Sequence, residues 1–516
     1  MRQANVLSIS DPRLVRAVGI ISQRSERESD SKRLVQSFVD TGILAQVDNS
    51  NNQIIFGRRG TGKTHLLRVL QAECEKSGMV AVYMDARVLG SSAQHLDPTL
   101  PLAHRCLALF RDLMSCLHTA LLDFVVNGPA GPGDLALALV DELAKSFADD
   151  SVRAETNAIT VKSVVNKKLS EGLKLASSLK EPAGIEYSDT AETGSQRETT
   201  AQVTVTKEDK IFYPSIHSIL ARLLSSLNTK VFLLMDEWSS LPQDIQPYVA
   251  DFLRRTMFAN PSVVVKIAAL EQRSAFSLRT AHGVVGFELG SDIGASVDLD
   301  DYYVYDKDPD SVVKAFTEML YRHVNGGMPE GYLEINGVRR SMDLRSALFE
   351  PEAFHELVHA SEGVPRDLIF IFVKAFFSAH RKQSRRIQRE FVQQEARQWY
   401  EQDKYQNLDD AQRRVLDAII RQVVVKAHSI TFLVLSEDEK NAGLQQLLDA
   451  RIVHLLRRGF VDSGARYSVF NLDFGTYAHL DTSIFVPFGS GRLTKKLIVS
   501  PELLLKARLP GNSPLF

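Results

Sequence analysis

The chain has 516 residues, of which 44% are hydrophobic and 24% charged, and its formal net charge is −2. That length exceeds what one hydrophobic core supports, so about two to four domains are expected. The near-zero charge excludes a global basic field that would draw the whole chain to nucleic acid or to an anionic membrane, so any such binding must come from local patches.

Cysteine usage and the N-terminus indicate a cytoplasmic protein. Cys74, Cys106 and Cys116 are isolated and lack the spacing of metal ligands, which is typical of a reduced, intracellular chain. Residues 1–10 lack a basic stretch followed by an apolar core, so no secretory signal is visible. Apolar runs such as residues 368–373 are far too short to span a bilayer, so no membrane partner is expected.

Residues 11–46 have helix-like apolar spacing, and a phosphate-binding loop at 57–64 follows the apolar run 53–56. Its glycines let consecutive backbone N–H groups curl around phosphate oxygens, and the next helix presents its positive N-terminal end to the same anion. Lys63 is expected to reach the β- and γ-phosphates, and Thr64 to ligate Mg²⁺. The expected nucleotide-binding residues are Gly57, Arg58, Arg59, Gly60, Thr61, Gly62, Lys63, Thr64 and His65.

The next segments predict a strand at 80–85, a long helix at 101–126 and then a polar insertion at about 151–209. The insertion is rich in Ser, Thr, Glu and Lys, which is typical of an exposed and partly disordered segment. Residues 206–209 resemble the guanine-reading tetrad of GTPases. That tetrad should follow the metal-binding strand, and this one precedes it, so GTP specificity is not favoured.

A second motif supports the phosphate-binding loop. The run 231–235 is suited to a buried parallel strand and ends in Asp236 and Glu237. Adjacent carboxylates at the end of a buried strand are costly unless they serve a cation and a water. Asp236 is expected to hold Mg²⁺ through its water shell, and Glu237 to orient and activate the attacking water.

The remaining pattern divides the chain into three parts. A helix at 242–258 and a strand at 263–270 complete an α/β core with a mostly parallel sheet, helices on both faces and a ligand at the C-terminal edge of the strands. Residues 310–402 are almost all helical. A helix at 411–425, a strand at 430–434, a helix at 441–459 and a hairpin around Gly464 suit a winged helix-turn-helix. The predicted domains are 1–305, 306–404 and 405–516.

With Gly363-Val364-Pro365-Arg366, and with Arg386-Ile387 leading into residues 391–399, the set of motifs resembles the AAA+ ATPases. The resemblance is closest to the origin-recognition and replication-initiator clade and its STAND-like bacterial relatives, and it covers most of residues 20–480 apart from the insertion. It implies a P-loop ATPase with ATP and Mg²⁺ as cofactors, a helical lid and a C-terminal winged helix. By this resemblance, Arg366 is the lid arginine that touches the γ-phosphate.

Two family positions depart from the pattern. Where the family places a small polar residue at the end of the 263–270 strand, the chain has Leu270, so Gln272 or Glu271 is the candidate to hold the water. The arginine finger, which a neighbouring subunit supplies, is assigned to Arg279. Arg273 is the next candidate, followed by Arg254 and Arg255. A finger supplied in trans implies a homo-oligomer.

Two functions stay open. In the first, an ATP-driven switch also binds double-stranded DNA through a local basic cluster formed by Arg451, His454, Arg457, Arg458 and Arg466. In the second, which the resemblance to bacterial relatives implies, a nucleotide-controlled signalling or scaffold ATPase, for example in anti-phage defence, recruits a protein effector without binding DNA. A P-loop small-molecule kinase is a third class, but it needs neither the Asp236-Glu237 pair with a lid arginine nor a winged helix.

Overall fold

The computed structural model describes residues 7–21, 31–90, 94–128, 133–147, 185–186, 202–203, 213–281, 283–302, 309–462 and 464–478. Most of the predicted insertion at 151–209, including the tetrad-like segment 206–209, lies outside these ranges. Two short strands within it, β3 (Ile185–Glu186) and β4 (Gln202–Val203), pair with each other in antiparallel fashion. No helix in the described part of the chain is long and apolar enough to cross a membrane.

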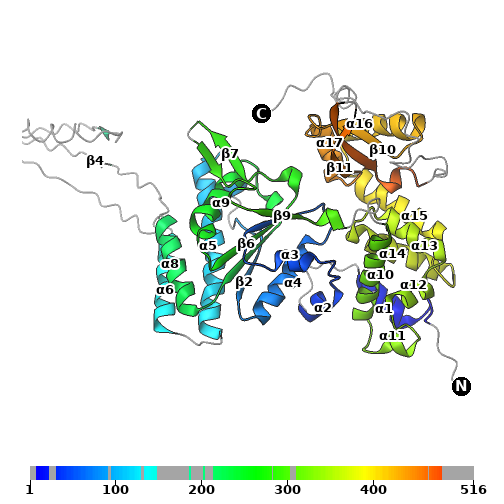
Figure 1. The fold of residues 1–516 in the computed structure, drawn as a ribbon, viewed down its shortest axis with the longest axis horizontal. Coiled ribbons are helices and arrows are strands. Elements are labelled where there is room, and N and C mark those ends of the chain that lie inside the picture. The colour runs from blue at the N-terminus through cyan, green and yellow to red at the C-terminus, as the bar shows by residue number, and fades with distance from the viewer. Residues whose placement is uncertain are drawn as a thin grey trace, which may run out of the picture.

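A five-stranded parallel sheet forms the centre of the N-terminal part (Figure 1). Its order is β2-β5-β6-β1-β9, and neighbouring strands pair in parallel throughout. The strands are β1 (Gln53–Phe56), β2 (Val80–Asp85), β5 (Val231–Asp236), β6 (Val263–Ala269) and β9 (Ala295–Asp298). The predicted α/β class is confirmed, and the strand predictions are accurate to about one residue. Because the strands are parallel, their C-terminal ends meet at one edge.

Helices cover both faces of this sheet because alternate strand residues point to opposite sides. On one face, residues such as Ile54 and Leu233 pack against α5 (Leu102–Asn127), α6 (Asp134–Phe147), α8 (Tyr213–Leu227) and α9 (Gln246–Leu253). On the other, Ile55 and Leu234 pack against α3 (Ile43–Val47) and α4 (Lys63–Lys76). A hairpin of β7 (Ser277–Thr280) and β8 (Gly283–Gly286) lies between β6 and β9 in the chain.

The lid helices stand beside the sheet domain in Figure 1. They are α10 (Pro309–Gly326), α11 (Tyr332–Ile335), α12 (Ser341–Leu348), α13 (Pro351–Ala360), α14 (Pro365–Arg381) and α15 (Arg389–Trp399), and a π-helical turn, Tyr400–Tyr405, extends α15. The segment predicted as helical at 11–46 contains three helices in its described part, α1 (Pro12–Ile21), α2 (Ser31–Ser37) and α3. Leu14 and Val18 of α1 pack into the core of the lid helices, so this helix joins the lid rather than the sheet domain.

The C-terminal part contains α16 (Asp410–Ile420), a π-helical turn (Arg421–Lys426), β10 (Thr431–Leu435), α17 (Ala442–Asp449), β11 (Val453–Asp462) and β12 (Ala465–Leu472). The strands form an antiparallel sheet of order β10-β12-β11. The prediction of one helix over 441–459 is wrong. Arg451 has φ 60°, which ends the helix, and Val453 then pairs with Leu472 of β12.

Candidate functional site

The phosphate-binding loop has the curled backbone that its glycines predict. Gly57, Gly60 and Gly62 have φ values of 152°, 88° and 98°, which side-chain-bearing residues adopt at a cost. At Gly60 the lid also comes close, because an added Cβ would lie 2.8 Å from the Cβ of Arg366. The backbone N–H of Arg366 donates to Gly60 O at 3.2 Å. The predicted lid arginine therefore lies against the loop.

Lys63 begins α4 and turns its ammonium back over the loop. Its Nζ donates to Gly57 O at 2.6 Å and to Arg58 O at 2.9 Å. Burial lowers the pKa of Lys63 to about 8, although the carboxylates of Asp300 and Asp236 act in the opposite direction. A phosphate that accepts from Lys63 would compete with these two carbonyls and would favour the protonated amine.

Hard oxygen donors meet where β5 ends beside the loop. The hydroxyl of Thr64 donates to Asp236 Oδ2 at 2.6 Å, and the hydroxyl of Tyr83 donates to the same oxygen at 2.8 Å. Asp236 is 1% exposed, and its Oδ1 accepts from Glu237 N at 2.8 Å. These residue types suit Mg²⁺, which binds through one or two protein oxygens with phosphate and water completing its shell. No cluster of three or more His, Cys, Asp or Glu side chains suited to a metal occurs among the described residues.

Glu237 follows Asp236 in a left-handed conformation, with φ 54°. Non-glycine residues adopt this region at a cost, and such strain is concentrated at functional sites. The turn leaves the carboxylate one-third exposed, with Arg87 Nη1 at 4.0 Å from Oε1. Ser240 Oγ lies 3.4 Å from Oε2. The sequence reasoning did not single out Arg87, although its place just after the end of β2 put it at the ligand edge of the sheet.

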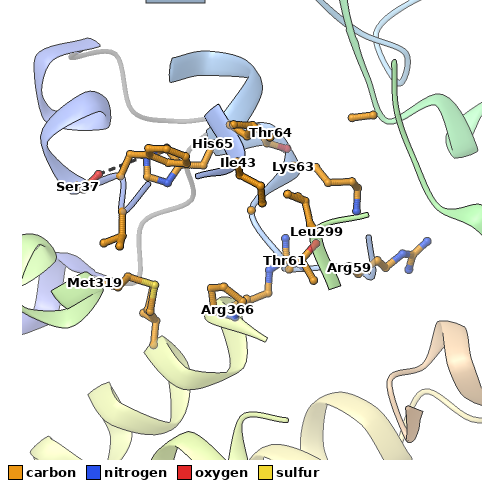
Figure 2. Close-up of a pocket in the computed structure, with 18 of the residues that line it drawn as sticks. Ser37, Ile43, Arg59, Thr61, Lys63, Thr64, His65, Leu299, Met319 and Arg366 are labelled. Atoms are coloured by element: carbon orange, nitrogen blue, oxygen red, sulfur yellow. Dashed lines mark hydrogen bonds between the residues drawn. The ribbon is translucent and has the colours of Figure 1, made fainter. Parts of the chain in front are cut away.

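A cavity of about 450 Å³ joins these groups. Residues 59–64, Glu237 and Arg366 line one end. Figure 2 labels Arg59, Thr61, Lys63, Thr64 and Arg366 of this set. The other end is lined by side chains of α2, the segment after it, α3 and the lid, namely Ser37, Phe38, Val39, Ile43, Met319 and His323, together with His65. The cavity thus has a charged end beside the loop and a mostly apolar end.

His65 lies at the apolar end. Its ring packs edge-on against Phe38 at 5.4 Å between centroids and lies nearly parallel to His323 of α10 at 6.4 Å. The Nε2 atom lies 2.8 Å from Leu34 O. Burial lowers the pKa of both histidines, to about 3 for His323, so both rings are neutral at physiological pH. Neutral aromatic and apolar walls suit a nucleobase rather than a second charged group.

Two predicted catalytic residues lie away from this cavity. Gln272 follows the end of β6 in a short 3₁₀ turn, Glu271–Arg273, and lines a different cavity of about 660 Å³ between the sheet domain and the C-terminal part. The prediction that Gln272 or Glu271 holds the water is therefore not supported by the geometry. Ser239 and Ser240 are polar residues that line the 450 Å³ cavity near the end of β6. The Ser239 hydroxyl accepts from Leu270 N at 2.7 Å, which fixes it there.

Arg279 also lies outside the cavity, on the exposed strand β7. The other finger candidates have partners within the chain: Arg273 pairs with Asp449 at 2.5 Å, and Arg254 and Arg255 both pair with Asp251. Arg279 is thus the candidate whose position on an exposed hairpin agrees best with the role predicted for it.

The backbone N–H and the side chain of Arg58, which is one of the predicted nucleotide-binding residues, have partners within the chain. That N–H donates to Asp300 Oδ2 at 2.9 Å, and Nε donates to Asp300 Oδ1 at 2.9 Å. Its Nη2 donates to Glu362 O of the lid at 3.1 Å, and Nη1 lies 2.5 Å from Nδ1 of His454 in β11. Arg58 therefore connects the loop to both other parts of the chain, while Arg59 is exposed and lines both cavities.

His454 belongs to a buried charged network. Its Nε2 lies 3.2 Å from Asp473 Oδ2, and Lys404 Nζ lies 2.5 Å from the same carboxylate oxygen and 3.0 Å from Asp367 Oδ2. Arg451 pairs with Asp367 and also with Asp403 at 2.6 Å. Burial alone would raise the pKa of Asp473, but Lys404 and His454 hold it at about 2. Burial lowers the pKa of His454 to about 4, so its ring is neutral.

This network corrects the predicted basic cluster. Arg451 and His454 are 8% and 1% exposed and serve internal contacts. Arg458 pairs with Glu271 at 2.9 Å and with Glu439 at 2.7 Å. Arg457 and Arg466 are exposed on the hairpin strands. Residues 453–458, which were predicted as part of a helix, lie in strand β11, whose pairing with β12 shifts register between Leu455 and Arg457 and again between Arg457 and Phe460.

The model of the ORC-CDC6-like family matches residues 20–81, which hold β1, the phosphate-binding loop and α4. The match confirms the resemblance to AAA+ ATPases of the origin-recognition clade that the motifs predicted. No curated protein matches the chain.

Solved structures with some likeness include Cdc6p from Pyrobaculum aerophilum, at 12% identity and a TM-score of 0.33, with 90% of this chain and 97% of that chain covered. The ORC2 protein of Aeropyrum pernix, in ADPNP–ADP complexes, has 12% identity and a TM-score of 0.35, with 95% and 97% covered. A RuvB variant of Thermotoga maritima has 13% identity and a TM-score of 0.33, with 86% and 94% covered. Such low values carry no argument about activity.

Proposed function

We propose that this protein binds ATP with Mg²⁺ and hydrolyses it as a nucleotide-dependent molecular switch. The observation that carries the proposal is the meeting of Thr64 and Asp236 at 2.6 Å beside the phosphate-binding loop, with Glu237 as the next residue. Two segments distant in sequence, the loop with the start of α4 and the end of β5, thus bring a phosphate cradle, a metal-binding pair and a carboxylate together. Phosphoryl transfer depends almost wholly on such positioning and charge stabilisation.

Each group has a task in this proposal. The loop N–H groups of residues 59–64 and the start of α4 bind phosphate oxygens, and Lys63 adds a positive charge. Thr64 and Asp236 would hold Mg²⁺, which neutralises phosphate charge. Glu237 orients the attacking water and accepts its proton, and Arg366 brings a lid charge to the same end of the cavity. The apolar end with His65 and Phe38 takes the base.

The proposed test is phosphate release from ATP by the purified chain. A Glu237→Gln variant should bind ATP as tightly as the unsubstituted protein but turn over at least about 100-fold more slowly, because an amide cannot accept the proton. Glu390→Gln, an exposed change at the start of α15, removes one negative charge elsewhere and should leave turnover unchanged. Equal turnover in the unsubstituted and Glu237→Gln proteins would contradict the proposal.

We propose that assembly completes the site, with Arg279 of one copy contacting the nucleotide of the next. Its exposure on the β7–β8 hairpin supports this role. ATP should then raise the apparent mass in light scattering, and Arg279→Ala should slow hydrolysis without weakening ATP binding by one copy. Hydrolysis that is independent of protein concentration and insensitive to Arg279→Ala would contradict it.

Recruitment of a protein effector is the second candidate, and the pairing of Arg451 and Arg458 with carboxylates favours it over DNA binding. Pull-downs with and without ATP, and with Lys63→Ala as control, should recover a partner in a nucleotide-dependent manner. If double-stranded DNA is bound instead, affinity should fall steeply with salt and should weaken in Arg457→Ala with Arg458→Ala. An affinity for DNA that falls steeply with salt and weakens in this double variant would favour DNA binding over recruitment of a protein effector.

A further inference from the structure

The phosphate-binding loop is held from the C-terminal part of the chain through one side chain. Arg58 is a loop residue, and its guanidinium contacts Asp300 after β9, Glu362 O in the lid and His454 in β11. The sequence separation between Arg58 and His454 is 396 residues. All three parts of the fold therefore meet at the second residue of the loop.

The protonation of His454 follows from its neighbours. A guanidinium has only donors, so Nδ1 of His454 must accept from Arg58, and the ring proton lies on Nε2. That N–H donates to Asp473 Oδ2 at 3.2 Å. The residue is 1% exposed, and a half-turn of its ring would put carbon atoms in place of Nδ1 and Nε2, so both contacts would be lost. His454 is thus fixed as an acceptor for Arg58.

The buried charged network that contains His454 also contacts the phosphate-binding loop at a second place. Asp473 and Asp367 share Lys404, which lies 2.5 Å and 3.0 Å from their carboxylates. Asp367 follows Arg366, whose N–H donates to Gly60 O at 3.2 Å. The loop therefore contacts β11 through Arg58 and α14 through Gly60. Buried ion pairs of Lys404 with Asp473 and Asp367 connect these two contacts.

We propose that His454 is a positioning residue of the nucleotide site, which holds Arg58 and so fixes the loop backbone in the form that binds phosphate. The inference rests on the proposed function. Arg58 O is one of the two carbonyls that accept from Lys63 Nζ, so the position of Arg58 also sets that of the lysine. A preorganised loop binds without the entropy loss of ordering it. Linkage then requires ATP binding to stabilise the docking of β11 against the loop.

The test is a double-mutant cycle on the full chain, with ATP-Mg²⁺ affinity measured by calorimetry. His454→Ala and Arg58→Ala should each weaken binding by about 2- to 10-fold, and the double variant should bind no more weakly than Arg58→Ala. His454→Asn, whose amide oxygen can replace Nδ1 as acceptor, should recover part of the affinity. In the unsubstituted protein, ATP should slow amide hydrogen exchange in β11.

Thr431→Val is the matched control, because it removes a buried hydrogen bond to Asn471 in the same C-terminal sheet without touching Arg58. Its melting temperature should fall and its ATP affinity should not. Wild-type affinity in His454→Ala, or losses that add in the double variant, would overturn the inference while leaving the proposed function standing. If the unsubstituted protein binds no ATP, the proposed function fails, and this inference fails with it.

Discussion

The backbone N–H of Arg366 donates to the carbonyl of Gly60 at 3.2 Å, so the lid contacts the phosphate-binding loop through the main chain. This approach needs glycine, because a Cβ at position 60 would lie 2.8 Å from Arg366 Cβ and 3.1 Å from Val364 Cγ1. The two elements would have to separate to accept a side chain. The nucleotide cavity lies between them, so its shape depends on this contact.

Gly60→Ala is therefore expected to lower the free energy of unfolding by about 1–3 kcal/mol through backbone strain and to weaken ATP binding as the lid moves away. Gly62→Ala is the matched control. Its φ of 98° carries similar strain, but no atom lies within 4 Å of the added Cβ. Thermal melting and ATP titration of both variants separate the strain, which they share, from the lid contact, which only Gly60 makes. Equal ATP affinities in the two variants would contradict the lid argument.

ATP affinity should fall as pH rises through about 8, because burial lowers the pKa of Lys63 from 10.5 to that value. Phosphate favours the charged lysine, so binding raises the pKa and takes up a proton where the amine is neutral. Calorimetry at a pH above 8 in buffers of different ionisation enthalpy measures that uptake. Lys63→Arg should remove the dependence, since a guanidinium stays protonated up to about pH 12. An unchanged dependence in this variant would exclude Lys63 as the cause.

The same shift sets the sign of a stability effect. Between pH values of about 8 and 10.5 the unfolded chain holds the Lys63 proton and the folded chain does not. The contribution of Lys63 to the free energy of unfolding should therefore rise with pH over this window and stay constant below it. The difference between the unsubstituted protein and Lys63→Met, measured by denaturant unfolding at several pH values, should show that rise.

Tyr83 is expected to lower the Mg²⁺ concentration that ATP binding requires. Its hydroxyl donates to the Asp236 oxygen that also accepts from Thr64, and its ring lies 3.5 Å from the Arg68 guanidinium carbon. Without the hydroxyl, Asp236 loses one of its two fixed donors on that oxygen. Tyr83→Phe should raise the Mg²⁺ concentration for half-maximal ATP binding by up to about 10-fold, as is usual for the partners of metal ligands. Tyr248→Phe on α9 is the control, and an equal shift there would contradict the prediction.

The parts of the site that lie within one short segment could be predicted from local sequence patterns. The loop at 57–64, the strand ending in Asp236 and the lid arginine at Arg366 each follow from short motifs, and residues 59–64, Glu237 and Arg366 line one cavity. Gln272 lies outside the predicted site because the direction of the chain after β6 depends on the 3₁₀ turn at Glu271–Arg273. No motif in the sequence specifies that turn.

Partners far apart in sequence could not be predicted. Nothing near Arg58 indicates that Asp300 and His454 accept from it, because that contact depends on how three parts of the fold pack. The same holds for α1, whose apolar face fits the lid and would fit the sheet domain equally well by sequence. In the C-terminal part, the mixture of charged and apolar residues at 451–458 led to the prediction of a helix. The left-handed conformation of Arg451, which follows α17, could not be predicted from that pattern.

Among the residues of the buried charged network, Lys404 is expected to contribute most to the free energy of unfolding. It is 2% exposed and lies between Asp367 and Asp473, whose charges raise its pKa against the effect of burial. Lys404→Met leaves two buried carboxylates without this cation, which should cost about 3–5 kcal/mol of unfolding free energy. Lys440→Met, at an exposed position, should cost almost nothing.

The pH dependence of this loss gives a sharper test. In the unsubstituted protein the pKa of Asp473 is about 2, below its usual 3.8, so its contribution is present above 3.8 and disappears as pH falls through 2. Without Lys404 the pKa of Asp473 should rise, and the folded state should bind a proton that the unfolded chain releases. The destabilisation of Lys404→Met should therefore shrink as pH is lowered toward 4. Denaturant unfolding of both proteins across this range measures it, and a loss independent of pH would show that packing rather than charge gives Lys404 its effect.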